Sequence, residues 1–288
     1  MLGSGGNRVR WEELPAAVHD AVADVLGSPV VQAVSQSGGF SPGSADRVLT
    51  AAGTRAFVKA VSPAQNPVSP TMHAREARVA ASLPAGLPAP QLLGAREVDG
   101  WQVLVLAEVA GRQPGLPWRA TDLRLVVEAL ETLADVGTPC PVPGLPTARE
   151  SLTGELPEEA LALLDGDTLV HLDLRADNVL LTDDGAVLVD WPHACLGPPW
   201  LDLLTLLFEV DRLGEQDLAE EVLRSSRLTT AVDPDVLTTV LAGFSRFFLD
   251  RAAEPPPPGL PTVREFQRVQ GEALAHWVAR RGSRSPQR

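Results

Sequence analysis

The chain has 288 residues, of which 44% are hydrophobic, enough to bury a full core in one large domain or in two lobes. Its net charge of −13 argues against a nucleic-acid partner and suits a cationic ligand. No apolar run approaches the ~18 residues that a membrane helix needs. The N-terminus also lacks the apolar stretch of a signal peptide. We therefore expect a cytoplasmic protein that neither spans nor binds a membrane.

The lysine content is unusually low. Of the 24 basic residues only Lys59 is a lysine, and the other 23 are arginines. A sequence that uses arginine wherever arginine suffices keeps a lysine where a compact ammonium group is needed and a planar guanidinium is not. A single lysine can also fall on the surface by chance, so its surroundings must decide.

The first 108 residues predict an antiparallel five-stranded sheet with one inserted helix. A helix is expected over Trp11–Leu26, and three strand-like runs follow within residues 30–61, the first two separated by the turn GGFSPGS. Ser69 is expected as the N-cap of the next helix, with Pro70 at its first position and its end near Leu83. The runs QLLGAREV and WQVLVLAEV, joined by an Asp-Gly turn, complete the sheet.

The remainder predicts a mainly helical lobe. The segment VLLTDDGAVLVD reads as two short strands around a turn, and EPPPPGLP reads as a stiff linker. The fold class is therefore α+β, with a lobe at 1–108, a helical lobe at 109–281 and a disordered tail at 282–288. Helices are expected at 121–136, 149–164, 200–213, 215–226, 234–252 and 262–281.

The segment HLDLRADN and the VLVDW that follows it carry the clearest chemical pattern. Asp173 and Asn178 are five residues apart on a loop, and Asp190 follows 12 residues later, after a hairpin. Phosphoryl transfer needs a carboxylate to orient the acceptor hydroxyl and oxygen ligands to hold Mg²⁺ against the triphosphate. Each of these residues alone would be better explained as a turn cap. Their combination favours a phosphoryl-transfer site.

These residues resemble the aminoglycoside phosphotransferase family, whose fold is similar to that of protein kinases, over roughly residues 30–280. The family's pattern His-x-Asp-x-x-x-x-Asn is seen here as His171, Asp173 and Asn178. The resemblance implies that Asp173 is the catalytic base, that Asn178 and Asp190 bind Mg²⁺, and that His171 supports the site. Arg175 either neutralises the migrating phosphoryl charge or is simply solvated.

Two further positions bear on this resemblance. Leu172 stands where glycine is frequent in the family, so the loop could sit slightly differently. Asp202, in GPPWLDLL, resembles an aspartate that braces the catalytic loop by hydrogen bonds. An ordinary helix N-cap is the simpler account of Asp202, and both roles can hold together.

Lys59 lies in the third expected strand, and Glu76 lies in the helix that follows. A kinase needs a cation on the α- and β-phosphates and a carboxylate that holds this cation in place. Lys59 and Glu76 match these two roles. The alternative for Glu76 is a solvent-facing pair with Arg75 or Arg78.

Two segments are expected to complete the nucleotide site. The glycine-rich turn would fold its backbone N–H groups over the phosphates, although such clusters are often only turns. Glu108, Val109 and Ala110 resemble the hinge whose backbone reads the purine, while packing residues are equally expected there. The turn residues in question are Ser37, Gly38, Gly39, Phe40 and Ser41.

The sequence thus predicts a kinase that uses ATP or GTP with Mg²⁺ and a small-molecule acceptor. An aminoglycoside or related antibiotic is the first candidate acceptor, and phosphorylating it would imply antibiotic resistance. Residues 202–254 hold 11 acidic residues against five arginines, and such an acidic surface would attract a polycationic acceptor. A solvated helix face gives the same count. Alternative acceptors are choline, homoserine, sugars, nucleosides or Ser/Thr of a natural-product peptide, and a third reading is a pseudokinase that only binds ligands.

Overall fold

The chain was analysed as a computed structural model, which describes residues 8–36, 42–256 and 262–284. The described residues form two compact units. The first contains the residues up to Leu83, Ala89–Arg112 and Val187–Pro192. The second contains Pro84–Pro88, Gln113–Ala186 and the residues from His193 onward.

The first unit is built on a five-stranded sheet in the order β1-β2-β3-β5-β4, with every neighbouring pair antiparallel. The expected sheet with one helix inserted after its third strand is confirmed. Its elements are η1 (Trp11–Glu13), α1 (Ala16–Leu26), β1 (Val30–Ser35), β2 (Ser44–Thr50), β3 (Arg55–Val61), α2 (Ser69–Ser82), β4 (Leu92–Val98) and β5 (Trp101–Ala107).

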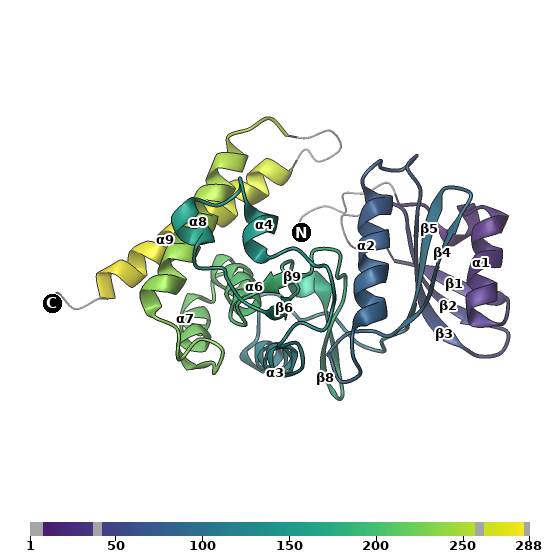
Figure 1. Cartoon of the computed structure of the whole chain (residues 1–288), viewed down its shortest axis with the longest axis horizontal. Coiled ribbons are helices and arrows are strands. Elements are labelled where there is room, and N and C mark those ends of the chain that lie inside the picture. The colour runs from purple at the N-terminus through teal and green to yellow at the C-terminus, as the bar shows by residue number, and fades with distance from the viewer. Residues whose placement is uncertain (1–7, 37–41, 257–261, 285–288) are drawn as a thin grey trace. The chain divides into compact units, whose positions relative to one another are not determined.

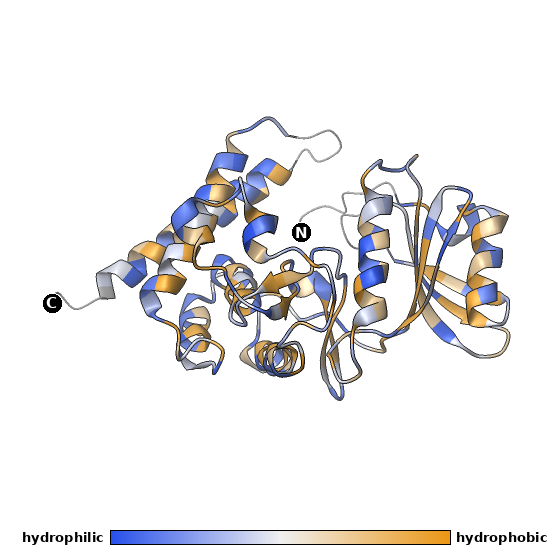
Figure 2. Cartoon of the chain, in the orientation of Figure 1, coloured by the Kyte–Doolittle hydropathy of each residue, from blue (hydrophilic) through white to orange (hydrophobic). Residues whose placement is uncertain are grey.

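The sheet lies between α1 and α2 (Figure 1). Side chains alternate between the faces of a strand, so Val58 and Ala60 pack with Val18 and Val22 of α1 in one hydrophobic cluster. Lys59 then points to the other face, toward α2. In Figure 2 the strands and α1 carry much hydrophobic colour, whereas α2 shows hydrophilic and hydrophobic colour in alternation. Leu104, which pairs with Lys59, is fully buried on the same face of the sheet, so the cation lies beside an apolar neighbour.

Both helices of this unit differ from the prediction at their starts. The helix expected over Trp11–Leu26 is broken, because Leu14 has an extended backbone and Pro15 precedes the first residue of α1. The predicted N-cap Ser69 is instead the first residue of α2. The side-chain oxygen of Asn66 accepts hydrogen bonds from the backbone N–H groups of Val68 and Ser69, which replaces the expected cap.

The second unit is mainly helical, as expected, and contains two small two-stranded sheets. The β6–β9 pair was not predicted, because strands of three residues give almost no periodic signal. The elements from residue 120 onward are α3 (Ala120–Val136), α4 (Ala148–Leu152), α5 (Glu158–Leu161), β6 (Thr168–Val170), η2 (Ala176–Asn178), β7 (Val179–Thr182), β8 (Gly185–Leu188), β9 (Cys195–Gly197), α6 (Leu201–Arg212), α7 (Gln216–Ser225), α8 (Pro234–Ala252) and α9 (Val263–Arg284). All belong to the second unit except the last two residues of β8, which belong to the first.

The helix predicted over residues 149–164 is wrong as a single element. It is divided into α4 and α5 because Gly154 takes a left-handed φ of 82° and Pro157 precedes α5 with an extended backbone. Helix α9 continues to Arg284, beyond the expected start of a tail at residue 282. Residues 257–261 of the predicted linker and residues 285–288 of the predicted tail lie outside the described residues.

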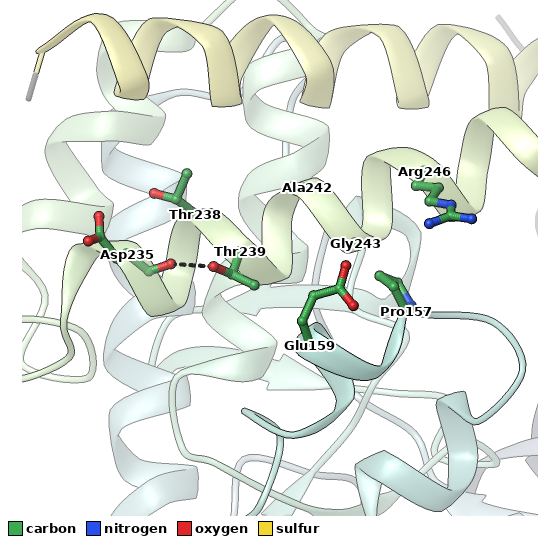
Figure 3. A pocket seen from close by; sticks show the side chains of 8 residues that line it. All are labelled: Pro157, Glu159, Asp235, Thr238, Thr239, Ala242, Gly243 and Arg246. Atoms are coloured by element: carbon green, nitrogen blue, oxygen red, sulfur yellow. Dashed lines mark hydrogen bonds between the residues drawn. The ribbon is translucent and has the colours of Figure 1, made fainter.

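No helix among the described residues has the length and apolar character required to cross a bilayer. An open cavity of about 570 Å³ lies in the second unit, lined by residues of α5 and α8 together with Pro157. Figure 3 shows Asp235, Thr238 and Thr239 along α8 at this cavity, with the Thr239 hydroxyl bonded to the Asp235 carbonyl. The lining contains none of the predicted site residues.

Helix α8 approaches α5 closely at Gly243. A Cβ atom at this position would lie 2.8 Å from the Cβ of Ala160 and 3.4 Å from Pro157. Neither neighbour has a flexible end that could move aside, so the glycine is needed for the contact.

We therefore expect Gly243→Ala to destabilise the protein by about 1–3 kcal/mol, because overpacking outweighs the gain in helix propensity. Gly282→Ala, in α9, is the control because nothing lies within 4 Å of its added methyl group. It should be neutral or slightly stabilising. Urea unfolding midpoints at constant m would measure both effects. A Gly243→Ala protein as stable as the wild type would contradict this account of the α5–α8 contact.

Candidate active site

The solitary lysine lies between two carboxylates in the first unit. The Lys59 Nζ donates to both oxygens of Glu76, at 2.8 and 2.9 Å, and to Oδ1 of Asp190 at 2.8 Å. The Glu76 side chain is only 4% exposed, which excludes the alternative of a solvent-facing pair with Arg75 or Arg78. Three residues that the sequence singled out therefore meet at one point.

Regular secondary structure brings two of these groups together. Lys59 pairs with Ala45 of β2 and Leu104 of β5, so its backbone is fixed at the centre of the sheet. Glu76 lies in the middle of α2, which contacts β3 and β5. A central strand and a packed helix place an ion pair more precisely than loops would.

The pKa values of the titratable groups around Lys59 are shifted from their ordinary values. Burial alone would lower the pKa of Lys59, but the Asp190 and Glu76 carboxylates outweigh burial and raise this pKa above its ordinary value. Burial raises the pKa of Glu76, and the Lys59 ammonium group opposes that effect. Burial, assisted by the Lys59 charge, lowers the pKa of nearby His73 to about 4, so His73 is neutral at physiological pH. The cluster therefore keeps a fixed cation.

Asp190 has a left-handed backbone, with φ of 71°. Aspartate tolerates this conformation better than most residues, at a cost of about 1–2 kcal/mol. Next to it, Trp191 is 2% exposed, and its indole N–H donates to the Leu188 carbonyl at 2.9 Å. The backbone N–H of Trp191 also donates to Glu76. The turn after β8 is thus tied to both the sheet and α2.

Arg8 is a member of this neighbourhood that the sequence did not single out. Val9 donates its backbone N–H to the Gly43 carbonyl at 3.2 Å, so the chain before α1 runs beside the exit of the glycine-rich turn. Gly43 has a φ of 108°, and a Cβ there would lie 2.6 Å from the Ala60 carbonyl oxygen. Burial lowers the pKa of Arg8, and the negative charges of Asp190 and Asp46 partly oppose this effect. No motif in the sequence marks this arginine.

The predicted phosphate-covering residues Ser37, Gly38, Gly39, Phe40 and Ser41 lie outside the described residues. At the predicted hinge, the Glu108 carboxylate lies 3.4 Å from Arg47 and 3.5 Å from Arg55. The Val109 carbonyl accepts from Gly111 at 3.0 Å and from Arg47 at 3.4 Å. Purine recognition by the backbone of Glu108 and Ala110 therefore stays a prediction.

In the second unit, Asp173 and Asn178 lie together in the segment HLDLRADN (residues 171–178), the predicted catalytic loop. The Asn178 amide nitrogen donates to the Asp173 carbonyl at 2.7 Å and to its Oδ2 at 3.2 Å. The Asp173 backbone N–H donates to Nδ1 of the fully buried His171 at 3.3 Å. Asp173 is thus held by His171 and Asn178, the other two residues of the predicted motif, while its side chain stays 36% exposed.

Asp202, at the start of α6, fixes the first part of this segment. Its carboxylate accepts backbone N–H groups from His171 at 2.7 Å and from Leu172 at 2.9 Å. Leu172 has a φ of 64°, the left-handed conformation that glycine adopts without strain. Burial raises the pKa of Asp202 to about 6, although the two N–H donors favour its charged form. Through these two hydrogen bonds Asp202 braces the loop.

Arg175 is paired within its own loop. Its guanidinium binds both oxygens of Asp177, with distances of 2.8 and 3.1 Å, and lies 4.0 Å from Asp173. The Arg175 side chain is 30% exposed, so it is not simply solvated. Asp177 is therefore engaged in an ion pair within the loop.

The donor atoms in both units suit Mg²⁺. The Asn178 amide nitrogen donates to Asp173, which leaves the amide oxygen to serve as a metal ligand. Asp190 supplies a carboxylate. Oxygen donors of this kind fit Mg²⁺, which usually takes one or two protein ligands together with phosphate oxygens and water. The joint role of Asn178 and Asp190 stays a prediction, because they belong to different units.

Sequence comparison finds one family. Residues 143–236, which include the whole catalytic-loop segment and Asp202, match the model of the phosphotransferase enzyme family. No curated protein matches the chain.

Solved structures with this fold cover nearly the whole chain. A thermostable mutant of aminoglycoside phosphotransferase APH(4)-Ia, in a ternary complex with AMP-PNP and hygromycin B, has a TM-score of 0.62 at 16% identity, covering 94% of this chain and 100% of that one. A putative fructosamine-3-kinase from Haemophilus somnus 129PT has a TM-score of 0.56 at 11% identity, with 92% and 96% covered. Spectinomycin phosphotransferase APH(9)-Ia has a TM-score of 0.54 at 11% identity, with 93% and 99% covered.

At such low identities these likenesses establish the fold, and the family match adds the enzyme type. Together they confirm the resemblance predicted from the sequence: residues 143–236 match the phosphotransferase enzyme family, and the chain has the protein-kinase-like fold seen in solved aminoglycoside phosphotransferases.

Proposed function

We propose that this chain transfers the γ-phosphoryl group of ATP to a hydroxyl of a small molecule, with an aminoglycoside or a related antibiotic as the first candidate acceptor. The observation that carries the proposal is the contact of Asn178 with Asp173 inside the His-x-Asp-x-x-x-x-Asn segment. One amide side chain there fixes the predicted base through its nitrogen and offers its oxygen to a metal ion.

Lys59 would hold the α- and β-phosphates, with Glu76 keeping it in place. Mg²⁺, when bound by Asp190 and Asn178, would neutralise charge between the phosphates. Lys59, which donates to Asp190 at 2.8 Å, would also face the phosphates.

Asp173 would accept the proton of the acceptor hydroxyl and orient its oxygen toward the γ-phosphorus. Arg175 would contribute positive charge near the transferred group. Its pairing with Asp177 keeps the guanidinium in a defined position 4.0 Å from Asp173.

The structure supports a cationic acceptor less strongly than the number of acidic residues in the sequence does. Seven of the 11 acidic residues of segment 202–254 are engaged in internal contacts. They are Asp202, Glu209, Asp211, Glu220, Asp233, Asp250 and Glu254. What supports a cationic acceptor is the overall charge of −13 and the exposed carboxylate of Asp173.

A screen of ATP consumption over aminoglycosides, amino alcohols, sugars, nucleosides and peptides tests the proposal. We expect at least one aminoglycoside to be phosphorylated, with the product identified by mass spectrometry. Turnover with another class alone would refute the acceptor assignment and keep the phosphotransferase. ATP binding without turnover on any acceptor would favour a binding module.

Lys59→Arg tests the phosphate-binding cation without removing its charge. A planar guanidinium cannot reproduce the three contacts of a compact ammonium group, so we expect turnover to fall about tenfold or more. Lys59→Ala is less clean, because it leaves Glu76 buried without its cation, which typically costs about 3–5 kcal/mol of stability. Arg55→Lys, on the same strand but largely exposed, is the matched control. Equal turnover in Lys59→Arg would refute the argument from the solitary lysine.

Asn178→Ala and Asp190→Asn should each raise the Mg²⁺ concentration needed for half-maximal activity, because each loses an oxygen ligand to a hard cation or weakens it. Asn178→Asp separates two effects, since it keeps a ligand oxygen and loses the N–H donors to Asp173. Calorimetric titration of Mg·ATP into each protein measures the effect on binding. Unchanged affinity and unchanged rate in both Asn178→Ala and Asp190→Asn would exclude this metal site.

Asp173→Asn should lower the single-turnover rate by ~10²–10⁴-fold, the usual contribution of a positioned base. Nucleotide affinity should persist, because Asp173 acts on the acceptor. Asp177→Asn is the control in the same loop and should cost far less, since it weakens only the pair with Arg175. A folded and fully active Asp173→Asn protein would show that another group removes the proton.

A further inference from the structure

Helix α6 carries a second carboxylate that reaches the catalytic loop. Glu209 lies seven residues after Asp202, which is two helical turns later on the same face. Its Oε2 accepts the backbone N–H of Ala176 at 2.9 Å and the indole N–H of Trp118 at 3.1 Å. The Glu209 side chain is 14% exposed, so these bonds are largely shielded from water.

Glu209 is itself fixed from the other side. Its Oε1 lies 3.5 Å from Nη2 of Arg212, and Nε of Arg212 donates to Gln270 of α9 at 2.9 Å. Gln270 is 3% exposed and donates to the Phe208 carbonyl of α6 at 3.1 Å. A chain of polar contacts therefore runs from Gln270 of α9 through Arg212 to the Glu209 carboxylate that holds the loop.

Two carboxylates of one helix thus hold the loop on both sides of Asp173. Asp202 binds the N–H groups of residues 171 and 172, and Glu209 binds the N–H of residue 176. We propose that Glu209 is a positioning residue of this phosphotransferase, which fixes the second half of the catalytic loop and thereby the Asp173 carboxylate. This inference rests on the proposed function for Asp173.

The competing account is that Glu209 only joins Trp118 to α6. Trp118 is 2% exposed, so its indole N–H needs an acceptor in any case. The two accounts differ in what happens at Ala176. A purely structural Glu209 would change global stability and leave the local opening of the loop as it was.

The chain offers a matched control in Glu220 of α7. Its carboxylate also accepts an indole N–H, from Trp277 at 2.7 Å, and also pairs with an arginine, Arg281, at 2.8 Å. The partners of Glu220 that the structure records do not include the catalytic loop. Removing either glutamate therefore removes the same kinds of bond, and only Glu209 removes one from residue 176.

The experiment measures amide hydrogen exchange at Ala176 in the full chain, without ligands, for Glu209→Ala, Glu209→Gln and Glu220→Ala. We expect exchange at Ala176 to rise about tenfold or more in Glu209→Ala, because a hydrogen bond to a charged acceptor is lost. Glu209→Gln keeps an acceptor oxygen and should retain most of the protection, and Glu220→Ala should leave Ala176 unchanged. Unchanged exchange at Ala176 in Glu209→Ala, or an equal rise in Glu220→Ala, would overturn the inference.

Turnover and nucleotide binding supply the second reading, with Mg·ATP and the acceptor identified by the screen. Glu209→Ala should lower kcat about tenfold at unchanged affinity for Mg·ATP, and Glu209→Gln should recover most of it. Equal losses of kcat in Glu209→Ala and Glu220→Ala would overturn the positioning role. If the wild type phosphorylates no acceptor, the proposed function fails, while the exchange result still decides whether Glu209 fixes the loop.

Discussion

The ammonium group of Lys59 is buried between the carboxylates of Glu76 and Asp190, and the first unit is organised around that charge. A buried ion pair is stable only while each member keeps its partner, and loss of one leaves an uncompensated charge. This explains why α2, which packs on the sheet, buries the charged Glu76. The sheet buries one set of apolar side chains against α1, and on the other face Lys59 lies beside the buried Leu104.

Backbone strain occurs in both units at residues of the candidate site. Leu172 and Asp190 are two of only three non-glycine residues with positive φ among the described parts of the chain. Each is held by the site itself, Leu172 through its N–H bond to Asp202 and Asp190 through its bond to Lys59. Such conformations persist only where surrounding contacts determine them, and they collect at functional positions. The glycine frequent at position 172 in the family would take this conformation without strain.

The sequence was sufficient for the sheet and the helical second unit, because periodicity and turn signals carry that information. The meeting of Lys59 with Glu76 was expected from the resemblance to kinases. The prediction failed where proline or glycine interrupted a segment with helical periodicity. Pro15 broke the first predicted helix, and Gly154 with Pro157 divided another. Contacts between distant residues, such as Val9 with Gly43, have no signature in one sequence. The excess of acidic residues in segment 202–254 was visible in the sequence, but the residues with which they pair inside the fold were not.

Helix α6 shows why such partners matter. Leucines at 203, 204, 206 and 207 are fully buried, so the helix has little access to water and every carboxylate on it needs a partner. Asp202 is satisfied by backbone N–H groups, Glu209 by a backbone and an indole N–H, and Asp211 by Arg280 of α9. These charges therefore cannot form a wall for a cationic acceptor. Two of them instead transmit the rigidity of a buried helix to the loop that carries Asp173, which a loop alone could not provide.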